Sequence, residues 1–296
     1  TGVVEKLSCG AESPSTNFVE LAKLITSPAF NESLQSFLNA GCTYAAAYEK
    51  ALQAFDSAAK LNSPNDILAL EYCKALQNTS ITPLFIQREQ ANYNDTSING
   101  VIASATAIRR ACVENKVEAA QKAVPANVAQ ALAGNHSVNE VLLWNLICYR
   151  LRLLTPTQIA EQCQCTEGLE NLLKQAENCN SLEEAVALCS KKRYPRTRIR
   201  RLFMQLLLGK ERCLFEQAEP AYIRVLAFND VGRQLLKEMK ESASLPIITK
   251  LGKYPANGQS EAFAQQLDLE LTASDILALV QKVPASAGSD YVSSPY

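Results

Sequence analysis

The sequence lacks long apolar runs, an excess of charge of either sign, and histidine. Its 296 residues carry 29 Lys and Arg against 30 Asp and Glu, which gives a formal net charge of −1. This balance excludes a uniformly basic nucleic-acid-binding protein, so a phosphate-binding surface must come from a local cluster of charge. The apolar runs are too short for a membrane span, and the first residues show no signal-peptide pattern. These absences favour a soluble, cytoplasmic protein of one or two domains.

The single histidine and the ten cysteines offer little for a metal centre. His136 lies in GNHSVNE, without an acid or nucleophile pattern around it, so we expect a surface or capping role. The cysteines lack the framework of a small disulfide-rich protein, which predicts reduced thiols. A zinc set from Cys163, Cys165, Cys179 and Cys189 is the alternative, but CxxC pairs are missing and no histidine lies nearby. We therefore predict no structural metal.

Candidate ligand-binding residues gather in the first third of the chain. Residues 1–11 predict a strand and a glycine turn at Gly10, where an open α/β sheet presents its ligand crevice; a simple turn glycine is the alternative. The block PNDILALEY starts a helix in which Asn65 is either an ordinary cap or a ligand contact. The block PLFIQRE predicts a strand that delivers Arg88 and Glu89 to the same crevice, unless they form an ordinary surface pair.

The segment IASATAIRR at 102–110 has the residues of a polyphosphate site. Ser104, Thr106 and Arg109 fall on the first turns of one predicted helix, where free backbone N–H groups and the helix dipole also favour anions. A plain Ser-capped helix accounts for Ser104 but gives no reason for Thr106 and Arg109 at the same end. The pattern therefore indicates phosphate binding.

Helical periodicity dominates the rest of the chain. Helices are predicted at 17–27, 31–40 and 43–60, with Asn31 as a cap and Gly41 as a stop, and then at 111–123, 126–133, 137–153, 156–164, 167–177 and 181–190. Trp144 falls at helical spacing among leucines, so we expect it in the core and not in a base-stacking platform. The end of the chain predicts a strand at 221–228, a helix at 230–240, a short strand in LPIITK and a final helix at 272–282.

One dense run of positive charge interrupts this neutral chain. Seven basic residues lie within eleven positions: Lys191, Lys192, Arg193, Arg196, Arg198, Arg200 and Arg201. Pro195 suits the first turn of a helix whose apolar stripe leaves these arginines on its flanks and outer face. A charge run is usually a solvated surface, but this density without interleaved acids favours phosphate binding. Tyr194 beside it is predicted either to stack on a base or to pack.

Taken in order, these segments resemble the tRNA(Met) cytidine acetate ligase family of the nucleotidyltransferase superfamily. The resemblance covers nearly the whole chain and rests on CGAES at 9–13, PNDILALEYCKAL, IQRE, ANYND, the SxTxIR pattern in IASATAIRR, KKRYPRTRIRRLF, AYIRVLAFNDVGRQLLKEMK and SLPIITK. The residues that it assigns to ATP are Gly10, Asn65, Arg88 and Glu89, with Ser104, Thr106 and Arg109 on the phosphates. It also implies Mg²⁺ with the ATP, an acetyl-adenylate intermediate, and acetylation of the wobble cytidine of elongator tRNA(Met) bound by the basic run.

The sequence departs from the family pattern at two places. The HxGH motif that the family carries near its amino terminus does not occur, and Asn94 stands where the family commonly has histidine. We therefore expect the first half of the active site to be absent and this chain to be incomplete for catalysis; a non-catalytic tRNA-binding module is the alternative. The expected fold is an α/β remnant of a Rossmann-like nucleotidyltransferase domain over 1–112, a mainly α-helical domain with a small α/β appendage over 113–285, and an extended tail over 286–296.

Overall fold

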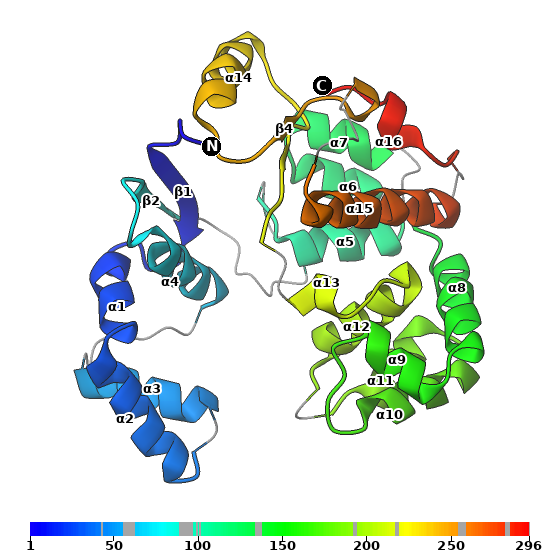
Figure 1. Ribbon diagram of the computed structural model, residues 1–296, viewed down its shortest axis with the longest axis horizontal. Helices are drawn as coiled ribbons and strands as arrows, with labels where there is room; N and C mark the ends of the chain where they lie inside the picture. Colours follow the sequence, from blue (N-terminus) through cyan, green and yellow to red (C-terminus); the bar gives the residue numbers. More distant parts are fainter. Residues whose placement is uncertain are drawn as a thin grey trace. The chain divides into compact units, whose positions relative to one another are not determined.

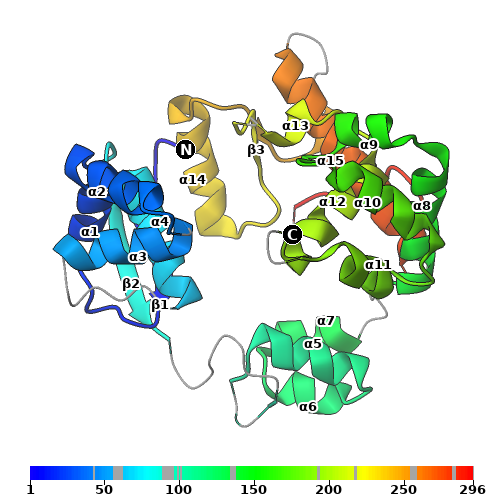
Figure 2. The same ribbon diagram turned by 90° about the horizontal axis from the view of Figure 1, so that it is seen from below.

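The computed structural model describes residues 1–42, 44–55, 63–88, 97, 98, 100, 102–133, 138–191, 194–216, 219–253, 259–281 and 285–295. The chain forms two compact units, Val4–Ala133 and Gly134–Tyr296 with Thr1–Val3. Figures 1 and 2 show their elements from two sides. The first unit therefore ends at Ala133, whereas the sequence analysis placed a boundary at residue 112.

Two parallel strands lead the first unit. β1 (Lys6–Ala11) and β2 (Thr82–Gln87) pair along their whole length, with Ala11 opposite Gln87 at the carboxyl ends. The strands predicted at these two places are thus confirmed. Because the two carboxyl ends lie at one edge, the residues that follow Ala11 and Gln87 leave the sheet side by side.

The connection between these strands is helical. Its elements are α1 (Phe18–Ile25), α2 (Pro28–Asn39), α3 (Tyr44–Phe55) and α4 (Pro64–Leu76). α4 packs against both strands, as Figure 1 shows, and the rings of Phe18 and Phe85 meet in the core with centroids 4.9 Å apart. Leu84 and Ile86 on the opposite side of β2 are exposed. The apolar core of this unit therefore lies on one face of the described sheet.

The start of α2 differs from the prediction. Ser27 caps this helix by accepting a hydrogen bond from Phe30 N at 3.2 Å, and Pro28 occupies the first turn. Asn31 therefore lies inside the helix, and the prediction that it is the cap was wrong, because the Ser-Pro pair one turn earlier starts the helix. Gly41, with φ of +84°, follows the end of α2 and confirms the predicted stop.

Three short helices complete the first unit. They are α5 (Ala105–Val113), α6 (Val117–Lys122) and α7 (Ala126–Ala133). The single helix expected at 111–123 is divided, since Asn115 adopts the left-handed conformation with φ of +59° between α5 and α6. The helix expected at 126–133 is confirmed.

The second unit opens with a closed helical core. Its elements are α8 (Glu140–Leu153), α9 (Pro156–Gln162), α10 (Leu169–Gln175), the 3₁₀ turn η1 (Ala176–Asn178), α11 (Leu182–Cys189) and α12 (Arg196–Leu208). The helices predicted from periodicity are confirmed here. Trp144 is buried in this core, as expected, and its ring packs edge-on against Phe203 with the ring centroids 6.0 Å apart.

The end of the chain is less regular than predicted. It contains α13 (Cys213–Glu216), β3 (Ile223–Arg224), α14 (Asp230–Ser242), β4 (Ile247–Ile248), η2 (Leu251–Lys253), α15 (Glu261–Val280) and α16 (Ser289–Val292). β3 and β4 pair in parallel over two residues each, so the strand expected at 221–228 is much shorter. The last long helix starts at Glu261, because Ser260 caps it, and not near residue 272. None of the described helices has both the length and the apolar character that crossing a membrane requires.

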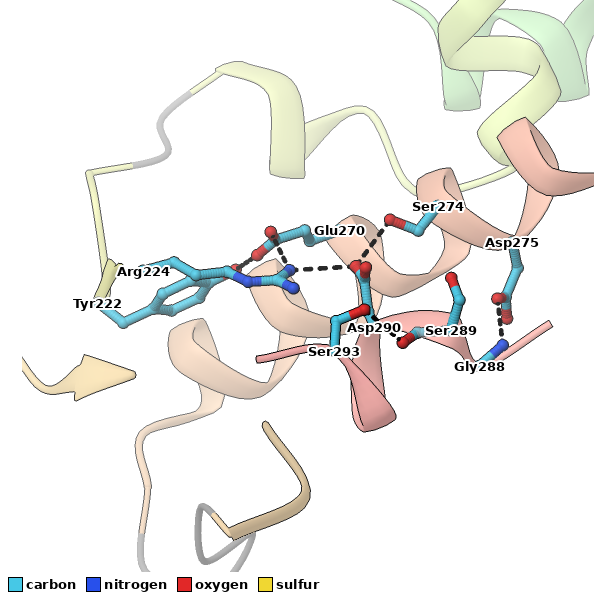
Figure 3. Close-up of polar contacts among 9 residues, drawn as sticks. All are labelled: Tyr222, Arg224, Glu270, Ser274, Asp275, Gly288, Ser289, Asp290 and Ser293. Atoms are coloured by element: carbon cyan, nitrogen blue, oxygen red, sulfur yellow. Dashed lines mark hydrogen bonds and ion pairs between the residues drawn. The ribbon is translucent and has the colours of Figure 1, made fainter. Parts of the chain in front are cut away.

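A polar network holds α16 against α15 (Figure 3). Arg224 pairs with Glu270 of α15 and, at 3.1 Å, with Asp290 of α16. Ser274 donates a hydrogen bond to Asp290 at 2.7 Å, and the Tyr222 hydroxyl donates to Glu270. The segment expected to be an extended tail thus contains a helix that is fastened to α15 by charge-assisted hydrogen bonds.

Candidate functional site

Three of the predicted ligand residues meet at the carboxyl edge of the two-stranded sheet. Asn65 Nδ2 donates a hydrogen bond to Glu12 Oε1 at 2.6 Å, and Arg88 Nε lies 3.6 Å from the same oxygen. Gly10 lies on β1 two residues before Glu12. Gly10, Glu12, Asn65 and Arg88 form what we call the Glu12 cluster, in which the glutamate joins segments from β1, α4 and β2.

Gly10 allows a close approach of Arg88 in this cluster. A Cβ atom at position 10 would stand 3.3 Å from Arg88 Cγ, tighter than an ordinary van der Waals contact. The backbone conformation of Gly10 is one that other residues adopt, since its φ is not positive. The glycine therefore lets the aliphatic part of Arg88 lie across the end of β1, which holds the guanidinium beside Glu12.

Asp66 holds the backbone turn that carries Glu12. Its side chain is 2% exposed, and Oδ1 accepts hydrogen bonds from Glu12 N at 2.9 Å and Ser13 N at 3.0 Å. Oδ2 accepts from Ser63 Oγ at 2.6 Å. A buried carboxylate with three donors fixes the turn after β1 against the start of α4. This support sets the position of Glu12.

The role of Asn65 follows from the same geometry. Ser63 stands at the N-cap of α4 and Pro64 in its first turn, so Asn65 is already inside the helix. The alternative that Asn65 is an ordinary helix cap was therefore wrong. Its side chain reaches back to Glu12, 53 positions earlier in the sequence.

One oxygen of Glu12 is available for a further partner. Glu12 Oε2 is buried and makes no hydrogen bond within the described part of the chain. Buried carboxylate oxygens in folded proteins nearly always accept a hydrogen bond. The Glu12 and Arg88 side chains are 29% and 34% exposed, so the cluster is open to a ligand at its surface. A bound group with a hydroxyl or amine donor would satisfy this oxygen.

The predicted phosphate helix is present as α5. Ser104 is buried, and its Oγ accepts a hydrogen bond from Ala107 N at 3.0 Å, so it serves as the cap that the plain alternative required. Thr106 and Arg109 are exposed on the first turns of this helix. α5 packs against α6, and its union with the Glu12 cluster in one site stays a prediction. Glu89, Asn94 and His136 lie outside the described residues.

The basic run is partly neutralised by an acid from another helix. Arg196 and Arg200 of α12 both pair with Glu183 in the first turn of α11. The expectation of a run without interleaved acids holds along the sequence but not in space. Lys191 and Arg201 are exposed, while Lys192 and Arg193 lie outside the described residues.

Arg198 and Tyr194 pack on each other. The guanidinium lies over the ring, 5.3 Å from its centroid, and donates to Gln164 O at 3.4 Å. The Tyr194 hydroxyl donates to Thr166 O at 3.2 Å. Of the two predictions for Tyr194, the structure therefore supports packing, since the ring also packs against the helical core.

All ten cysteines are free thiols in the structure. Burial raises the pKa of Cys189 to about 12. A hydrogen bond between the thiols of Cys163 and Cys165, together with burial, raises the pKa of Cys163 above its ordinary range, and the same hydrogen bond lowers that of Cys165. Among the described residues no group of three or more His, Cys, Asp and Glu side chains has the arrangement to hold a metal ion.

Sequence reasoning missed Glu12 and Asp66. Glu12 lies inside the CGAES segment that the resemblance singled out, and Asp66 directly follows Asn65. The available signal was an acid in the first turn of a helix that starts with Ser-Pro, where a carboxylate is stabilised by free backbone N–H groups. That signal does not reveal a partner more than 50 positions away.

Comparison with known proteins gives consistent results. A family model described as HIGH Nucleotidyl Transferase matches residues 1–290. The chain is 33% identical to the tRNA(Met) cytidine acetate ligase of Thermoanaerobacter sp. (strain X514), over 98% of this chain and 75% of that protein. It is 32% identical to the tRNA(Met) cytidine acetate ligase of Clostridium perfringens (strain ATCC 13124), over 99% and 76% of the two chains.

Two solved structures share the fold. The crystal structure of Thermotoga maritima TmcAL (apo, form I) has a TM-score of 0.83 at 24% identity and covers 99% of this chain and 77% of that one. The structure of the same protein bound with alpha-thio ATP has a TM-score of 0.83 at 23% identity, with 99% and 76% covered. The nucleotidyltransferase-like fold expected from the sequence is thereby confirmed.

Proposed function

Since this chain belongs to the tRNA(Met) cytidine acetate ligase family of HIGH nucleotidyl transferases, we propose that it binds ATP and acetate and serves the acetylation of a cytidine in tRNA(Met). The observation that carries this proposal is the Glu12 cluster, where Asn65 and Arg88 converge at the carboxyl edge of a parallel sheet. Ligands of open α/β sheets bind at this edge.

In the first reaction an acetate oxygen attacks the α-phosphorus of ATP, the bond from that phosphorus to the bridging oxygen breaks, and pyrophosphate leaves. The protein contributes positioning and positive charge, because the developing charge spreads over phosphate oxygens. In the second reaction the exocyclic amine of cytidine attacks the acetyl carbonyl, AMP leaves, and the amine loses one proton. Neither step requires a protein nucleophile.

The residues divide between the two ends of the nucleotide. We assign Gly10, Asn65, Arg88 and Glu89 to the adenosine end, and Ser104, Thr106 and Arg109 to the phosphates. Glu12 orients Asn65 and Arg88 before ATP arrives, since both contact one carboxylate oxygen. Its second oxygen, Oε2, would accept a hydrogen bond from a ligand hydroxyl, because a buried acceptor without a donor is costly.

Magnesium fits as a companion of the phosphates and not as a ligand of this cluster. Both oxygens of Asp66 already accept hydrogen bonds, and Glu12 Oε1 is shared by Asn65 and Arg88. Mg²⁺ commonly keeps several waters and binds nucleotide phosphates through few protein groups. The ion would supply positive charge for the leaving pyrophosphate when it is bound.

The proposed RNA surface is the basic start of α12. Lys191 and Arg201 are exposed and form no ion pair in the part of the chain that the structure describes, and we assign Lys192, Arg193, Arg196, Arg198 and Arg200 to the same surface. Phosphate contacts of this kind position an RNA without reading its sequence. ATP and tRNA as substrates favour the cytoplasm as the site of action.

The test compares two asparagines that both lie near the start of a helix. Asn65→Ala should weaken ATP binding roughly three- to tenfold, measured by calorimetry, because it removes a ligand contact and the partner of Glu12. Asn31→Ala on α2 is the matched control and should leave ATP binding unchanged, since Asn31 is exposed. Equal ATP affinity of the two variants would contradict the assignment of this site.

Because the HxGH motif does not occur in this sequence, the reaction itself is tested in a version extended to include that motif, by exchange of labelled pyrophosphate into ATP. Exchange should depend on added acetate and should fall strongly in Arg109→Ala, because a cation near the phosphates is lost. Exchange that proceeds without acetate would rule out acetate as the activated acid. An unchanged rate in Arg109→Ala would remove this arginine from the phosphate site.

A further inference from the structure

A separate hollow lies on the surface of the second unit. It has a volume of about 430 Å³ and is lined by one face of α8 and by the segment between η1 and α11. The lining residues are Trp144, Asn145, Cys148, Tyr149, Arg152, Leu153, Cys179 and Asn180. We call it the Tyr149 pocket. Its volume falls within the range of sites that hold small organic groups.

The floor of this pocket is rigid. Trp144 is 4% exposed, and its Nε1 donates to Cys179 O at 3.2 Å, which ties α8 to the segment before α11. The indole also meets Phe203 of α12 edge-on. Burial raises the pKa of Cys148, which stays a neutral thiol in the floor. The polar atom of the indole is therefore satisfied, and the floor offers an apolar surface of fixed shape.

The rim of the pocket carries polar groups that are not engaged. Asn145, Tyr149 and Arg152 are exposed, and within the described residues their side chains form no hydrogen bond or ion pair. Tyr149 is 60% exposed, a large value for an aromatic residue in the middle of a long helix. An exposed ring, an amide and a guanidinium around an apolar floor are the groups that hold an unstacked nucleobase.

Asn180 lines the pocket from the segment between η1 and α11. Its backbone N–H and its Nδ2 both donate to Glu184, at 2.8 and 3.4 Å. These bonds fix the amide, and Oδ1 accepts no hydrogen bond within the described residues. This acceptor and the Asn145 amide match the mixed donors and acceptors on the Watson–Crick edge of a base.

The pocket adjoins the basic start of α12. Asn180 precedes Ser181, the cap of α11, and Glu183 in the same first turn pairs with Arg196 and Arg200. α12 also packs directly on α8. Positive charge for phosphates and a hollow for a base thus lie on neighbouring elements of one unit. A single-stranded nucleotide needs both.

We propose that the Tyr149 pocket binds an unpaired base of the RNA whose phosphates contact the start of α12. The base stacks on Tyr149, its edge faces Asn145 and Asn180, and Arg152 contacts an adjacent phosphate. This inference rests on the proposed function, from which tRNA is taken as the partner, and it adds a recognition site outside the nucleotide site.

Trp144 makes the proposal directly measurable. It is the single tryptophan of the chain and lies in the floor of the pocket, so its fluorescence reports on occupancy. Titration with tRNA(Met), and with a short single-stranded RNA, should quench this emission. Quenching by the single-stranded RNA but not by a perfectly paired RNA duplex of the same length supports an unpaired base as the occupant.

The decisive variants are Tyr149→Ala and Tyr149→Phe. Loss of one base–aromatic stack should weaken binding of tRNA(Met) by about five- to a hundredfold in Tyr149→Ala, whereas Tyr149→Phe keeps the stack and should bind within about twofold of the parent. The salt dependence of the affinity should not change in Tyr149→Ala, since no phosphate contact is removed. Tyr291→Ala, at an exposed tyrosine of α16, is the matched control and should bind like the parent.

The outcomes distinguish failure of this proposal from failure of the proposed function. Equal affinity of Tyr149→Ala and the parent for tRNA(Met) overturns the pocket but leaves tRNA as the substrate. Absence of RNA binding by the parent overturns both, and would leave a protein as the occupant to seek. The circular dichroism and thermal unfolding of Tyr149→Ala should equal those of the parent, so a change in either would indicate damage to the fold.

Discussion

The two clusters in which arginine pairs with glutamate at a proposed ligand site are built differently. In the first unit Arg88 meets Glu12, which is 29% exposed and held by the buried Asp66. In the second unit Arg196 and Arg200 meet Glu183, which is 59% exposed and has no comparable support. One acid belongs to a half-buried network, and the other lies in solvent.

Under the proposed function, this difference distinguishes a site that is ordered before its ligand binds from a surface whose ion pairs a ligand can replace. Charges in a half-buried network are ordered before the ligand arrives, and loss of one member leaves others without partners. Exposed ion pairs contribute only about 0–1 kcal/mol to stability, so phosphate oxygens can replace the acid at little cost. We therefore expect loss of the buried support in the first unit to affect stability and ATP together, and substitutions at α12 to affect RNA alone.

The largest effect should come from Asp66→Ala. The change removes the acceptor of Glu12 N, Ser13 N and Ser63 Oγ in a buried place, and we expect a loss of about 2–4 kcal/mol in the free energy of unfolding of the first unit. Hydrogen exchange of the Glu12 and Ser13 amides measures this loss. Glu71→Ala, on the exposed side of the same helix, is the control. Unchanged protection of both amides would show that Asp66 does not support the cluster.

The next prediction tests whether a partly buried carboxylate of the second unit affects stability as the buried carboxylate of the first unit does. Burial alone would raise the pKa of Asp290, but hydrogen bonds from Ser274 and Arg224, and the charge of Arg224, outweigh it and lower that pKa below its ordinary value. The stabilisation by ionised Asp290 is therefore present above the ordinary aspartate pKa and disappears as the pH falls through the lowered one.

We expect Asp290→Asn to weaken the attachment of α16 by about 1–3 kcal/mol at neutral pH. The difference from the parent should shrink as the pH falls below about 4, where the parent also loses the charge. Hydrogen exchange of α16 over a pH series measures both. Asp268→Asn, at a 66% exposed carboxylate of α15, should change little. A difference that grows on acidification would mean that the sign of the coupling is wrong.

Most helices of both units could be predicted from the sequence, because an apolar stripe of helical period is a local property. Strands were also predicted at the places of β3 and β4, but the length of β3 was not, since the length of a strand depends on how much of its partner is available to pair. Segment 221–228 is rich in β-forming residues, yet only Ile223 and Arg224 find partners in β4. Local patterns therefore predicted a longer strand here than the structure contains.

The candidate sites show the same limit. Gly10, Asn65 and Arg88 came from the family resemblance, and composition alone favoured a turn glycine and a helix cap. The partner that joins Asn65 and Arg88 is Glu12, and a hydrogen bond across 53 positions leaves no periodic signal. Likewise the basic run was visible as charge density, while its pairing with Glu183 depends on how α11 and α12 pack. The charged residues could therefore be found from the sequence, whereas their partners depend on the packing of the helices.

A smaller effect is expected from Glu12→Gln, and here stability and binding should separate. Glutamine keeps an oxygen for Asn65 but loses the charge that holds Arg88, so we expect ATP affinity to fall about tenfold. The free energy of unfolding should fall by less than about 1 kcal/mol, because one buried polar atom without a partner replaces another and only the partly exposed ion pair with Arg88 is lost. Calorimetry with ATP and urea unfolding measure the two quantities. A fall in stability equal to the loss of affinity would indicate a purely structural glutamate.

The smallest effect should come from Glu183→Gln, which removes the charge of the exposed acid in the second unit. The change frees Arg196 and Arg200 from their shared acid, so we expect tRNA affinity to rise by about two- to threefold at low salt. The affinity should also fall more steeply with salt, by up to about one unit of slope for each freed phosphate contact.

Filter binding over a salt series measures both the affinity and its salt dependence. The variant with Arg196, Arg198 and Arg201 changed together to Ala should show the opposite changes. The stability of the second unit should change by less than about 1 kcal/mol, since both partners lie in solvent. Weaker tRNA binding by Glu183→Gln would mean that this pair orders the arginines, as Glu12 orders Arg88, and that the two sites are built alike.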